Sequence, residues 1–333
     1  MKVKQFSEIV GNYPTRRILR KLIDSQRMPH ALIFSGPEGV GKKATAYSLI
    51  MLLNCSKVED DSFCGTCQNC KLIESGNHPD IHIIMPESER SEIGIDLIRS
   101  LTREIYKKPF LAKYKSVVID NVERMTVEAS NALLKMLEEP PGSAVIFLIT
   151  SSLDALLPTI RSRGQVFRFG AIPFSNLQKH LEQTGGMTPE EARHIAGLGM
   201  GSMSRALSWD EEDEERLNLT LDLFEKMIIN QDYSAFIEYM DKMKQGRDEF
   251  DRLLKCSYTI LRDILILKWD GDEKYLINIH KKEVIKKISE KTNEYQLKEL
   301  LSDFAMWSNV NRKYLSVKIN AEDFSFRVQS LLK

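Results

Sequence analysis

The chain has 333 residues, of which 42% are hydrophobic and 28% charged, a composition typical of a globular protein with two or three domains. Its 47 basic and 47 acidic side chains cancel, so no net field attracts the chain to nucleic acid or to an anionic membrane. The sequence has no apolar run long enough for a spanning helix, and residues 1–10 lack the apolar core of a signal peptide. These features predict a cytoplasmic protein that makes no membrane contact.

Strand and helix patterns alternate through the first half of the chain. Apolar runs typical of buried strands lie at 31–34, 81–84, 117–119, 145–149 and 166–169. Apolar side chains at helical spacing lie at 13–25, 42–53, 95–106 and 127–137. Strands that alternate with helices of this length form crossover units. Residues 1–170 are therefore expected to form an α/β domain, with a parallel sheet that has helices on both faces.

The remainder of the chain is predicted to be helical. Residues 171–208 are expected to form a small helical domain, in which a capping box begins a short helix at Thr188. Gly197 and Gly199 are expected to end that helix. Residues 209–333 begin with an acidic stretch and continue with long helical periodicities, which predict an all-helical C-terminal domain.

A glycine-rich motif follows the first predicted strand. It consists of Gly36, Gly39, Gly41 and Lys42. The motif lies between a buried strand and a helix, where backbone N–H groups and the helix N-terminus bind phosphate, so it predicts a P-loop. In a working loop Ser or Thr follows the lysine and binds magnesium, whereas this chain has Lys43, which has no acceptor lone pair. Magnesium is therefore not expected to bind here.

A second nucleotide-site pattern is the apolar run 117–119 that ends in Asp120. It resembles the strand whose terminal aspartate assists magnesium in P-loop ATPases. The next residue of a working site is a glutamate that activates the attacking water. This chain has Asn121, whose neutral amide is no base near pH 7. Because Lys43 and Asn121 both lack the required chemistry, the chain alone is not expected to hydrolyse ATP.

Four of the five cysteines lie within residues 55–70, in a polar segment that permits tight turns. Their spacing predicts a tetrahedral zinc site in a compartment that disfavours disulfides. Four protein ligands leave no open position for substrate, so the Zn²⁺ would be structural. The predicted ligands are Cys55, Cys64, Cys67 and Cys70. His78 is a competing ligand, and Cys256 is predicted to be helix core.

Further segments carry a resemblance to a known family. They are 75–80 (SGNHPD), 130–141 (SNALLKMLEEPP) and 159–163 (TIRSR), together with the cysteine insert. Over residues 6–208 the chain resembles the AAA+ clamp-loader subunits of bacterial DNA polymerase III, and 131–141 is the most specific part. This resemblance implies an AAA+ P-loop domain at residues 1–170, a helical lid at 171–208 and an all-α collar for oligomerisation at 209–333.

The resemblance also implies partners and an activity. Such subunits assemble with motor (gamma/tau) and delta subunits into a hetero-pentamer, which opens the ring-shaped sliding clamp and places it on primed DNA. The motor subunits keep the hydroxyl after the P-loop lysine and the glutamate after the strand aspartate. Delta-prime subunits commonly lack them, so Lys43 and Asn121 favour the delta-prime type. Whether ATP or ADP occupies the degenerate site is left open.

Roles for individual residues follow from the same resemblance. In the Ser-Arg motif of the family, an arginine projects to the γ-phosphate bound by a neighbouring motor subunit, which implies Arg163 as an arginine finger in trans. Arg161 is its competitor. The sensor-1 position falls at Thr150 or Ser151. Arg205 lies one residue beyond the sensor-2 position, about 100° further around a helix, which argues against nucleotide sensing by Arg205.

The sequence leaves two other functions open. An ATP-hydrolysing gamma/tau-type motor subunit of the same complex would show magnesium-dependent turnover by the chain alone. A zinc-dependent DNA-binding or repair protein would show strong, salt-sensitive DNA affinity without partners, which a net charge of zero disfavours.

Overall fold

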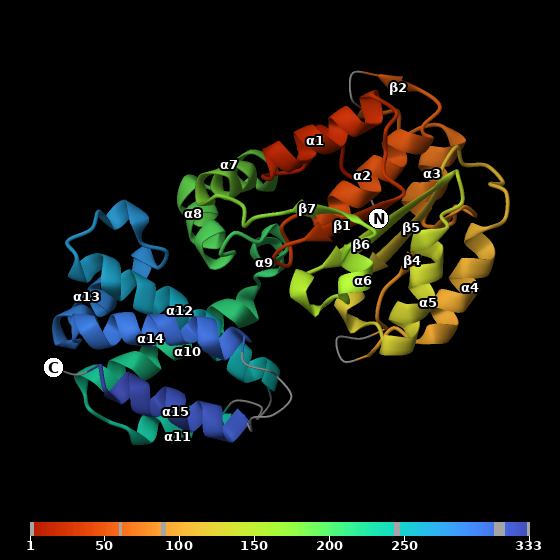
Figure 1. Ribbon diagram of the computed structural model, residues 1–333. Helices are drawn as coiled ribbons and strands as arrows, with labels where there is room; N and C mark the ends of the chain where they lie inside the picture. Colours follow the sequence, from red (N-terminus) through yellow and green to blue (C-terminus); the bar gives the residue numbers. More distant parts are fainter. Residues whose placement is uncertain (1–2, 60–61, 88–90, 243–246, 310–316, 332–333) are drawn as a thin grey trace. The chain divides into compact units, whose positions relative to one another are not determined.

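The computed structural model describes residues 3–59, 62–87, 91–242, 247–309 and 317–331. The chain divides into two compact units, both drawn in Figure 1. The first unit contains Met1–Gly185 and Met200–Arg205, and the second contains Gly186–Gly199 and Ala206–Lys333.

A five-stranded parallel sheet forms the centre of the first unit (Figure 1). Its strands are β1 (Ala31–Ser35), β4 (Ile81–Ile84), β5 (Lys115–Asp120), β6 (Ala144–Thr150) and β7 (Gln165–Arg168). They lie in the order β4-β5-β6-β1-β7, and every neighbouring pair is parallel. The predicted α/β class is confirmed, because each expected strand is present with its ends displaced by no more than two residues.

Helices cover both faces of this sheet, because side chains in a strand point alternately to opposite faces. Ile33 and Ile146 point to the face covered by α4 (Ile95–Ile105), α5 (Val127–Glu138) and the short α6 (Pro158–Arg161). Phe34 and Phe147 alternate with them, and their ring centroids lie 5.7 Å apart. The other face is covered by α2 (Lys42–Asn54), against which α3 (Gln68–Ser75) packs. The first unit also contains α1 (Tyr13–Asp24) and α7 (Phe174–Gly185).

The second unit is built of helices, and the part of it that the structure describes contains no strand. Its helices are α8 (Pro189–Leu198), α10 (Glu211–Phe224), α11 (Ser234–Lys242), α12 (Arg247–Lys268), α13 (Lys282–Lys291), α14 (Glu294–Asn309) and α15 (Val317–Gln329), and α9 (Met203–Ser208) spans the boundary between the units. A π-helical turn, Glu225–Ile229, continues α10. The core of this unit includes the fully buried Phe224, Phe324 and Leu261.

The N-terminus of α8 confirms the predicted capping box, whereas its C-terminus corrects a prediction. Thr188 Oγ1 accepts a hydrogen bond from the Glu191 N–H at 3.3 Å, and Glu191 Oε2 accepts one from the Thr188 N–H at 2.8 Å. Gly197 does not end the helix, because α8 continues to Leu198 and Gly199 is its C-cap residue. A Cβ at Gly197 would lie 2.6 Å from the Ile277 side chain. Gly197 therefore allows α8 to pack closely against Ile277, and it does not end the helix.

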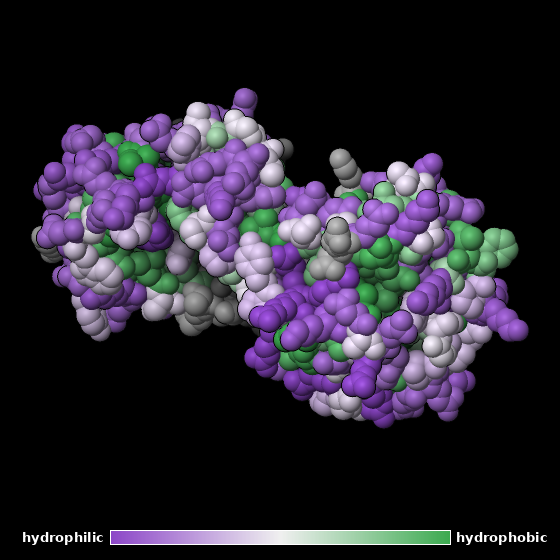
Figure 2. All heavy atoms as spheres, turned by 90° about the horizontal axis from the view of Figure 1, so that it is seen from above, coloured by the Kyte–Doolittle hydropathy of each residue, from purple (hydrophilic) through white to green (hydrophobic). Residues whose placement is uncertain are grey.

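Hydrophilic side chains cover most of the molecular face shown in Figure 2, and hydrophobic ones are visible in smaller areas between them. Among the helices that the structure describes, none combines the length and hydrophobicity needed to cross a bilayer.

Candidate functional site

The predicted P-loop connects β1 to α2 and depends on its glycines. Gly36, Gly39 and Gly41 have φ angles of 151°, 72° and 97°, a region of backbone space that favours glycine. A Cβ at Gly36 would lie 2.0 Å from the carbonyl oxygen of Phe169, and one at Gly39 would lie 2.0 Å from Ser202 Oγ. The loop therefore has no room for a side chain at either position.

Lys42, the predicted phosphate ligand, begins α2 and is turned back onto the loop. Its ammonium donates hydrogen bonds to the carbonyl oxygens of Gly36 and Pro37, the second at 2.6 Å. Burial lowers the pKa of Lys42, although nearby carboxylates oppose that shift. These two hydrogen bonds leave one N–H donor of the ammonium for a further acceptor.

Lys43 and Asp120, the two residues of the predicted magnesium position, form an ion pair. The Lys43 ammonium is 3.1 Å from the Asp120 carboxylate, and the two side chains are 35% and 18% exposed. Asp120 ends β5, whereas Lys43 lies in the first turn of α2. The fold thus brings both predicted residues together, and the carboxylate that would assist a metal ion is paired with a cation of the chain.

Asn121 follows in the left-handed region, with φ 54° and ψ 50°, and begins a short 3-10 turn at Val122–Arg124. That turn carries Glu123, a residue that the sequence analysis missed. Glu123 Oε1 accepts hydrogen bonds from the Ser151 backbone N–H at 2.9 Å and from its hydroxyl at 2.5 Å. Ser151 is thereby held at the end of β6, beside Thr150, whose hydroxyl donates to the Ser152 carbonyl oxygen at 2.9 Å. The sequence signal that could have indicated Glu123 is its position three residues after Asp120, the aspartate that ends the strand.

The segment that carries Arg205 docks on the P-loop. The Met203 N–H donates to the Gly39 carbonyl oxygen at 2.9 Å, and the Arg205 N–H donates to Ser202 Oγ at 3.2 Å. Burial lowers the pKa of Arg205, opposed by the negative charge of Glu38. This close docking explains why Gly39 cannot carry a side chain.

The four predicted zinc ligands come together. Their Sγ atoms all lie within 4.8 Å of one another, and those of Cys55 and Cys64 are 3.6 Å apart. A tetrahedron with Zn–S bonds of about 2.3 Å has edges of about 3.8 Å, so this arrangement fits zinc. Cys55 follows α2, Cys64 follows the strand β3 (Ser62–Phe63), which pairs with β2 (Val58–Glu59), and Cys67 and Cys70 lie at the start of α3.

Backbone donors prepare the cluster for a cation. The Cys64 N–H donates to Cys55 Sγ, and the Cys67 N–H donates to Cys64 Sγ, both at 3.3 Å. Hydrogen bonds from Thr66 and Cys67 lower the pKa of the Cys64 thiol to about 6, which favours the thiolate that binds metal, whereas burial raises the pKa of the Cys55 and Cys70 thiols. The competing ligand His78 lies outside the cluster, since its Nδ1 accepts from the Asp80 N–H at 3.1 Å.

Cys256, the fifth cysteine, lies in α12 and is 4% exposed, so its prediction as helix core is confirmed. Burial raises the pKa of this thiol to about 12.

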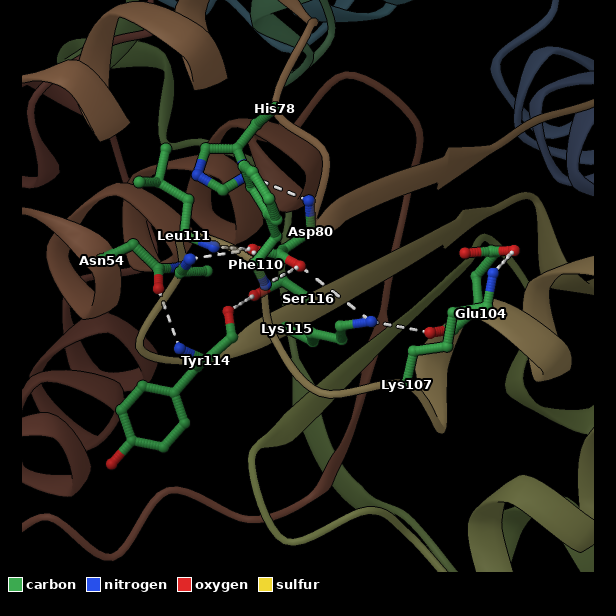
Figure 3. A network of polar contacts seen from close by, with 11 residues as sticks. Asn54, His78, Asp80, Glu104, Lys107, Phe110, Leu111, Tyr114, Lys115 and Ser116 are labelled. Atoms are coloured by element: carbon green, nitrogen blue, oxygen red, sulfur yellow. Dashed lines mark hydrogen bonds and ion pairs between the residues drawn. The ribbon is translucent and has the colours of Figure 1, made fainter.

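A polar network around Asp80, shown in Figure 3, connects β4 and β5 to the segment between α4 and β5. The Asp80 carboxylate precedes β4 and accepts hydrogen bonds from the backbone N–H groups of Phe110, Leu111 and Ala112. The Lys115 ammonium lies 4.0 Å from it. Desolvation opposes ionisation of Asp80, but the three N–H groups and Lys115 together lower its pKa.

The same network reaches α2 and α3. Asn54, at the end of α2, accepts from the Tyr114 N–H at 2.9 Å, and its carbonyl oxygen accepts from the Asn69 side chain at 2.7 Å. His78 Nε2 lies 3.2 Å from Asn69 Oδ1. These contacts fix α3, and with it Cys70, on the sheet.

Both arginines of the Ser-Arg motif are ion-paired. Arg163 lies 2.7 Å from Glu138 Oε1 and also donates to the Thr159 carbonyl oxygen at 3.0 Å. Arg161 pairs with Asp154 at 3.0 Å. About a third of each arginine side chain is exposed, at 35% and 34%. The ion pair of Glu138 with Arg163 was not predicted from the sequence, because the two residues lie in separate elements.

Comparisons with known proteins relate this geometry to one family. The family described as "DNA polymerase III, delta subunit" matches residues 12–173. The delta-prime subunit of DNA polymerase III from Pseudomonas aeruginosa is 40% identical over 134 residues, which cover 40% of this chain and 41% of that subunit. The delta-prime subunit from Bacillus subtilis is 29% identical over 265 residues, covering 78% and 79%. The chain is similar to delta-prime subunits of DNA polymerase III.

The chain is also similar to gamma/tau subunits of DNA polymerase III. The gamma/tau subunit of Mycobacterium tuberculosis H37Rv is 33% identical over 168 residues, covering 50% of this chain and 29% of that subunit. Among solved structures, a gamma subunit-related protein from Thermotoga maritima matches with a TM-score of 0.52 and 22% identity, over 95% of this chain and 99% of that one. This similarity supports the observed fold, a parallel α/β sheet domain followed by helices.

Proposed function

We propose that this chain is a non-hydrolysing delta-prime-type subunit of the DNA polymerase III clamp loader. In that role it helps to load the sliding clamp on primed DNA, in a cytoplasmic hetero-pentamer with gamma/tau-type motor subunits and a delta subunit. Residues 1–170 would be its AAA+ domain, 171–208 its lid and 209–333 its collar. Contact with DNA and with the clamp would be made through the complex.

The observation that carries the proposal is the ion pair between Lys43 and Asp120. A magnesium ion bound there would have to displace an ammonium that already neutralises the carboxylate, and Lys43 has no lone pair with which to bind the metal. Asn121 supplies no base for water. ATP or ADP could reach the glycine loop only without the usual metal, so the site is degenerate.

The catalytic contribution of the chain would be Arg163, supplied in trans to ATP bound by a neighbouring motor subunit. A guanidinium is always charged and can contact two phosphate oxygens at once. Arg163 is partly exposed, and its pairing with Glu138 holds the guanidinium at the end of α5. Glu138 acts as a positioning residue in this proposal, because it orients the arginine without touching nucleotide.

The zinc ion would be structural. Cys55, Cys64, Cys67 and Cys70 supply four sulfur ligands and leave no position for a reacting molecule. The metal would crosslink the end of α2 to α3, which the Asn54 and Asn69 contact already holds together.

The direct test is reconstitution with motor and delta subunits. The proposal predicts that the isolated chain shows no ATP turnover above background, while the complete complex shows clamp- and DNA-stimulated turnover that depends on Arg163. Magnesium-dependent turnover by the isolated chain, lost in Lys42→Ala, would instead support a gamma/tau-type motor.

A further inference from the structure

Two histidines and a glutamate meet in the second unit, far from the nucleotide and cysteine sites in the sequence. His194 lies in α8, Glu214 in the first turns of α10, and His280 in a short 3-10 turn, Ile279–Lys281. One atom of each residue lies within 4.8 Å of the other two. His194 Nε2 is 3.1 Å from Glu214 Oε2, and His280 Nε2 is 3.6 Å from Glu214 Oε1.

These separations fit the coordination of one metal ion. In a tetrahedral site, ligand bonds of about 2.0–2.2 Å to nitrogen and carboxylate oxygen place neighbouring ligand atoms about 3.3–3.6 Å apart. The two imidazole rings are nearly perpendicular, with centroids 4.6 Å apart, so both Nε2 atoms can converge on one point without stacking of the rings. Glu214 presents one oxygen to each histidine.

The outer contacts of His194 are those of a metal ligand. Its Nδ1 lies 2.9 Å from the carbonyl oxygen of Ile277, which can only accept a hydrogen bond. Nδ1 therefore donates to this carbonyl oxygen. While no metal is bound, Nε2 also carries a proton and donates to Glu214 Oε2 at 3.1 Å, and a metal ion would take the place of that proton. Metal-bound histidines commonly donate their other ring N–H to a backbone carbonyl in this way.

Hydrogen bonds to Asp263 hold the segment that contains Ile277 and His280. Asp263, fully buried in α12, accepts hydrogen bonds from the Ile277 N–H at 3.1 Å and from the Asn278 N–H at 2.7 Å. Gly197 allows α8 to approach Ile277 closely, and this glycine lies one turn beyond His194. The capping box at Thr188 fixes the start of α8. A site whose ligands are oriented by such contacts loses little entropy on binding.

We propose that His194, Glu214 and His280 form a binding site for a divalent transition-metal ion, with Zn²⁺ the preferred ion. Two imidazoles and a carboxylate suit zinc and cobalt, and disfavour calcium and magnesium, which prefer all-oxygen ligands. Three protein ligands leave a fourth position for water. The His280 side chain is 42% exposed, so the ion can enter from solvent. The bound metal would join α8 to α10 and to the 3-10 turn.

The test uses the full-length chain with zinc already bound at its cysteines. Co²⁺ is added, and visible absorption and bound cobalt are measured after equilibrium dialysis. A nitrogen and oxygen site gives d–d bands without the thiolate-to-cobalt charge transfer that a cysteine site produces, so the two sites are distinguished. The variants are His280→Ala and Glu214→Gln, and the control is His30→Ala, which removes an exposed histidine outside the cluster.

We expect the wild-type chain and His30→Ala to bind one cobalt ion with d–d absorption only. Affinity should fall at least about tenfold in His280→Ala and in Glu214→Gln, because each loses a direct ligand. His280→Ala keeps the proposal testable if Glu214→Gln fails to fold, since its side chain is the more exposed of the two. Equal cobalt binding by wild type and His280→Ala, or no binding by wild type, would overturn the proposal.

Discussion

The Lys43 ammonium lies 3.1 Å from the Asp120 carboxylate, so a cation of the chain itself pairs with the carboxylate that we propose as the degenerate magnesium site. Lys43→Thr removes that cation and introduces the hydroxyl that binds magnesium in working P-loops. We expect Lys43→Thr to bind ATP more tightly with magnesium than without it, while wild type shows no magnesium dependence. Titration with a fluorescent ATP analogue measures this.

Lys42→Ala in the Lys43→Thr background is the control, and it should abolish the gain. A wild-type chain whose ATP affinity already depends on magnesium would contradict the proposed role of the ion pair.

The cysteine cluster predicts a specific loss of zinc. Cys67→Ala should release the ion, because three sulfurs no longer complete the tetrahedron. The sheet should remain folded, since its core lies in β1, β5 and β6. Zinc content by elemental analysis and circular dichroism give the two readouts. Cys256→Ala is the matched control and should keep its zinc; equal zinc in both variants would refute the assignment.

Asp80 predicts a pH-dependent contribution to stability. Backbone N–H groups and Lys115 hold its pKa below the ordinary value of about 3.9 despite burial, so the contribution is fully present above pH 3.9 and is lost as pH falls through the lowered value. Asp80→Asn should lower the free energy of unfolding by about 1–3 kcal/mol at pH 7. The difference from wild type should shrink in acid below about pH 4.

Urea unfolding at the two pH values tests this expectation. Asp96→Asn is the control, because that side chain is 95% exposed, and it should change stability little at either pH. If Asp80→Asn lowers the free energy of unfolding by the same amount at both pH values, the ionised carboxylate is not the cause of the loss.

Replacing Gly197 with alanine should destabilise the packing of α8, although it raises the helix propensity. Alanine favours helix over glycine, but its Cβ would lie 2.6 Å from Ile277. We expect Gly197→Ala to destabilise the chain by about 1–3 kcal/mol because of overpacking. Gly142→Ala has nothing within 4 Å of its added Cβ and serves as control. Thermal unfolding in which Gly197→Ala melts at or above wild type would contradict this reading.

The parts of the fold that could be predicted are those whose cause is local. Buried parallel strands are continuous apolar runs, so β1 and β6 were found nearly to their ends, and the α8 cap follows from Thr188 and its neighbours. Gly197 was misread because its neighbour Ile277 comes from a separate segment. Motif analysis found Lys43 and Asp120 singly, but only the pairing of β1 with β6, and of β6 with β5, brings them into contact.

The same limit applies to Glu123, Glu138 and Glu214. Each is one of many acidic residues in the sequence. Its partner lies in a different element, and no sequence pattern links the two. Cysteines are fewer, so their spacing alone indicated the cluster.

The most direct test of the account is the ATPase of a reconstituted complex that contains Arg163→Ala, with Arg161→Ala as the matched variant. Native mass spectrometry or size-exclusion chromatography first establishes that both variants assemble into the complex. We predict that Arg163→Ala lowers clamp- and DNA-stimulated turnover severalfold, because the neighbouring site loses the guanidinium that stabilises its transferring phosphoryl group, whereas Arg161→Ala changes it little. Unchanged turnover in Arg163→Ala, with or without a loss in Arg161→Ala, would contradict the role proposed for Arg163.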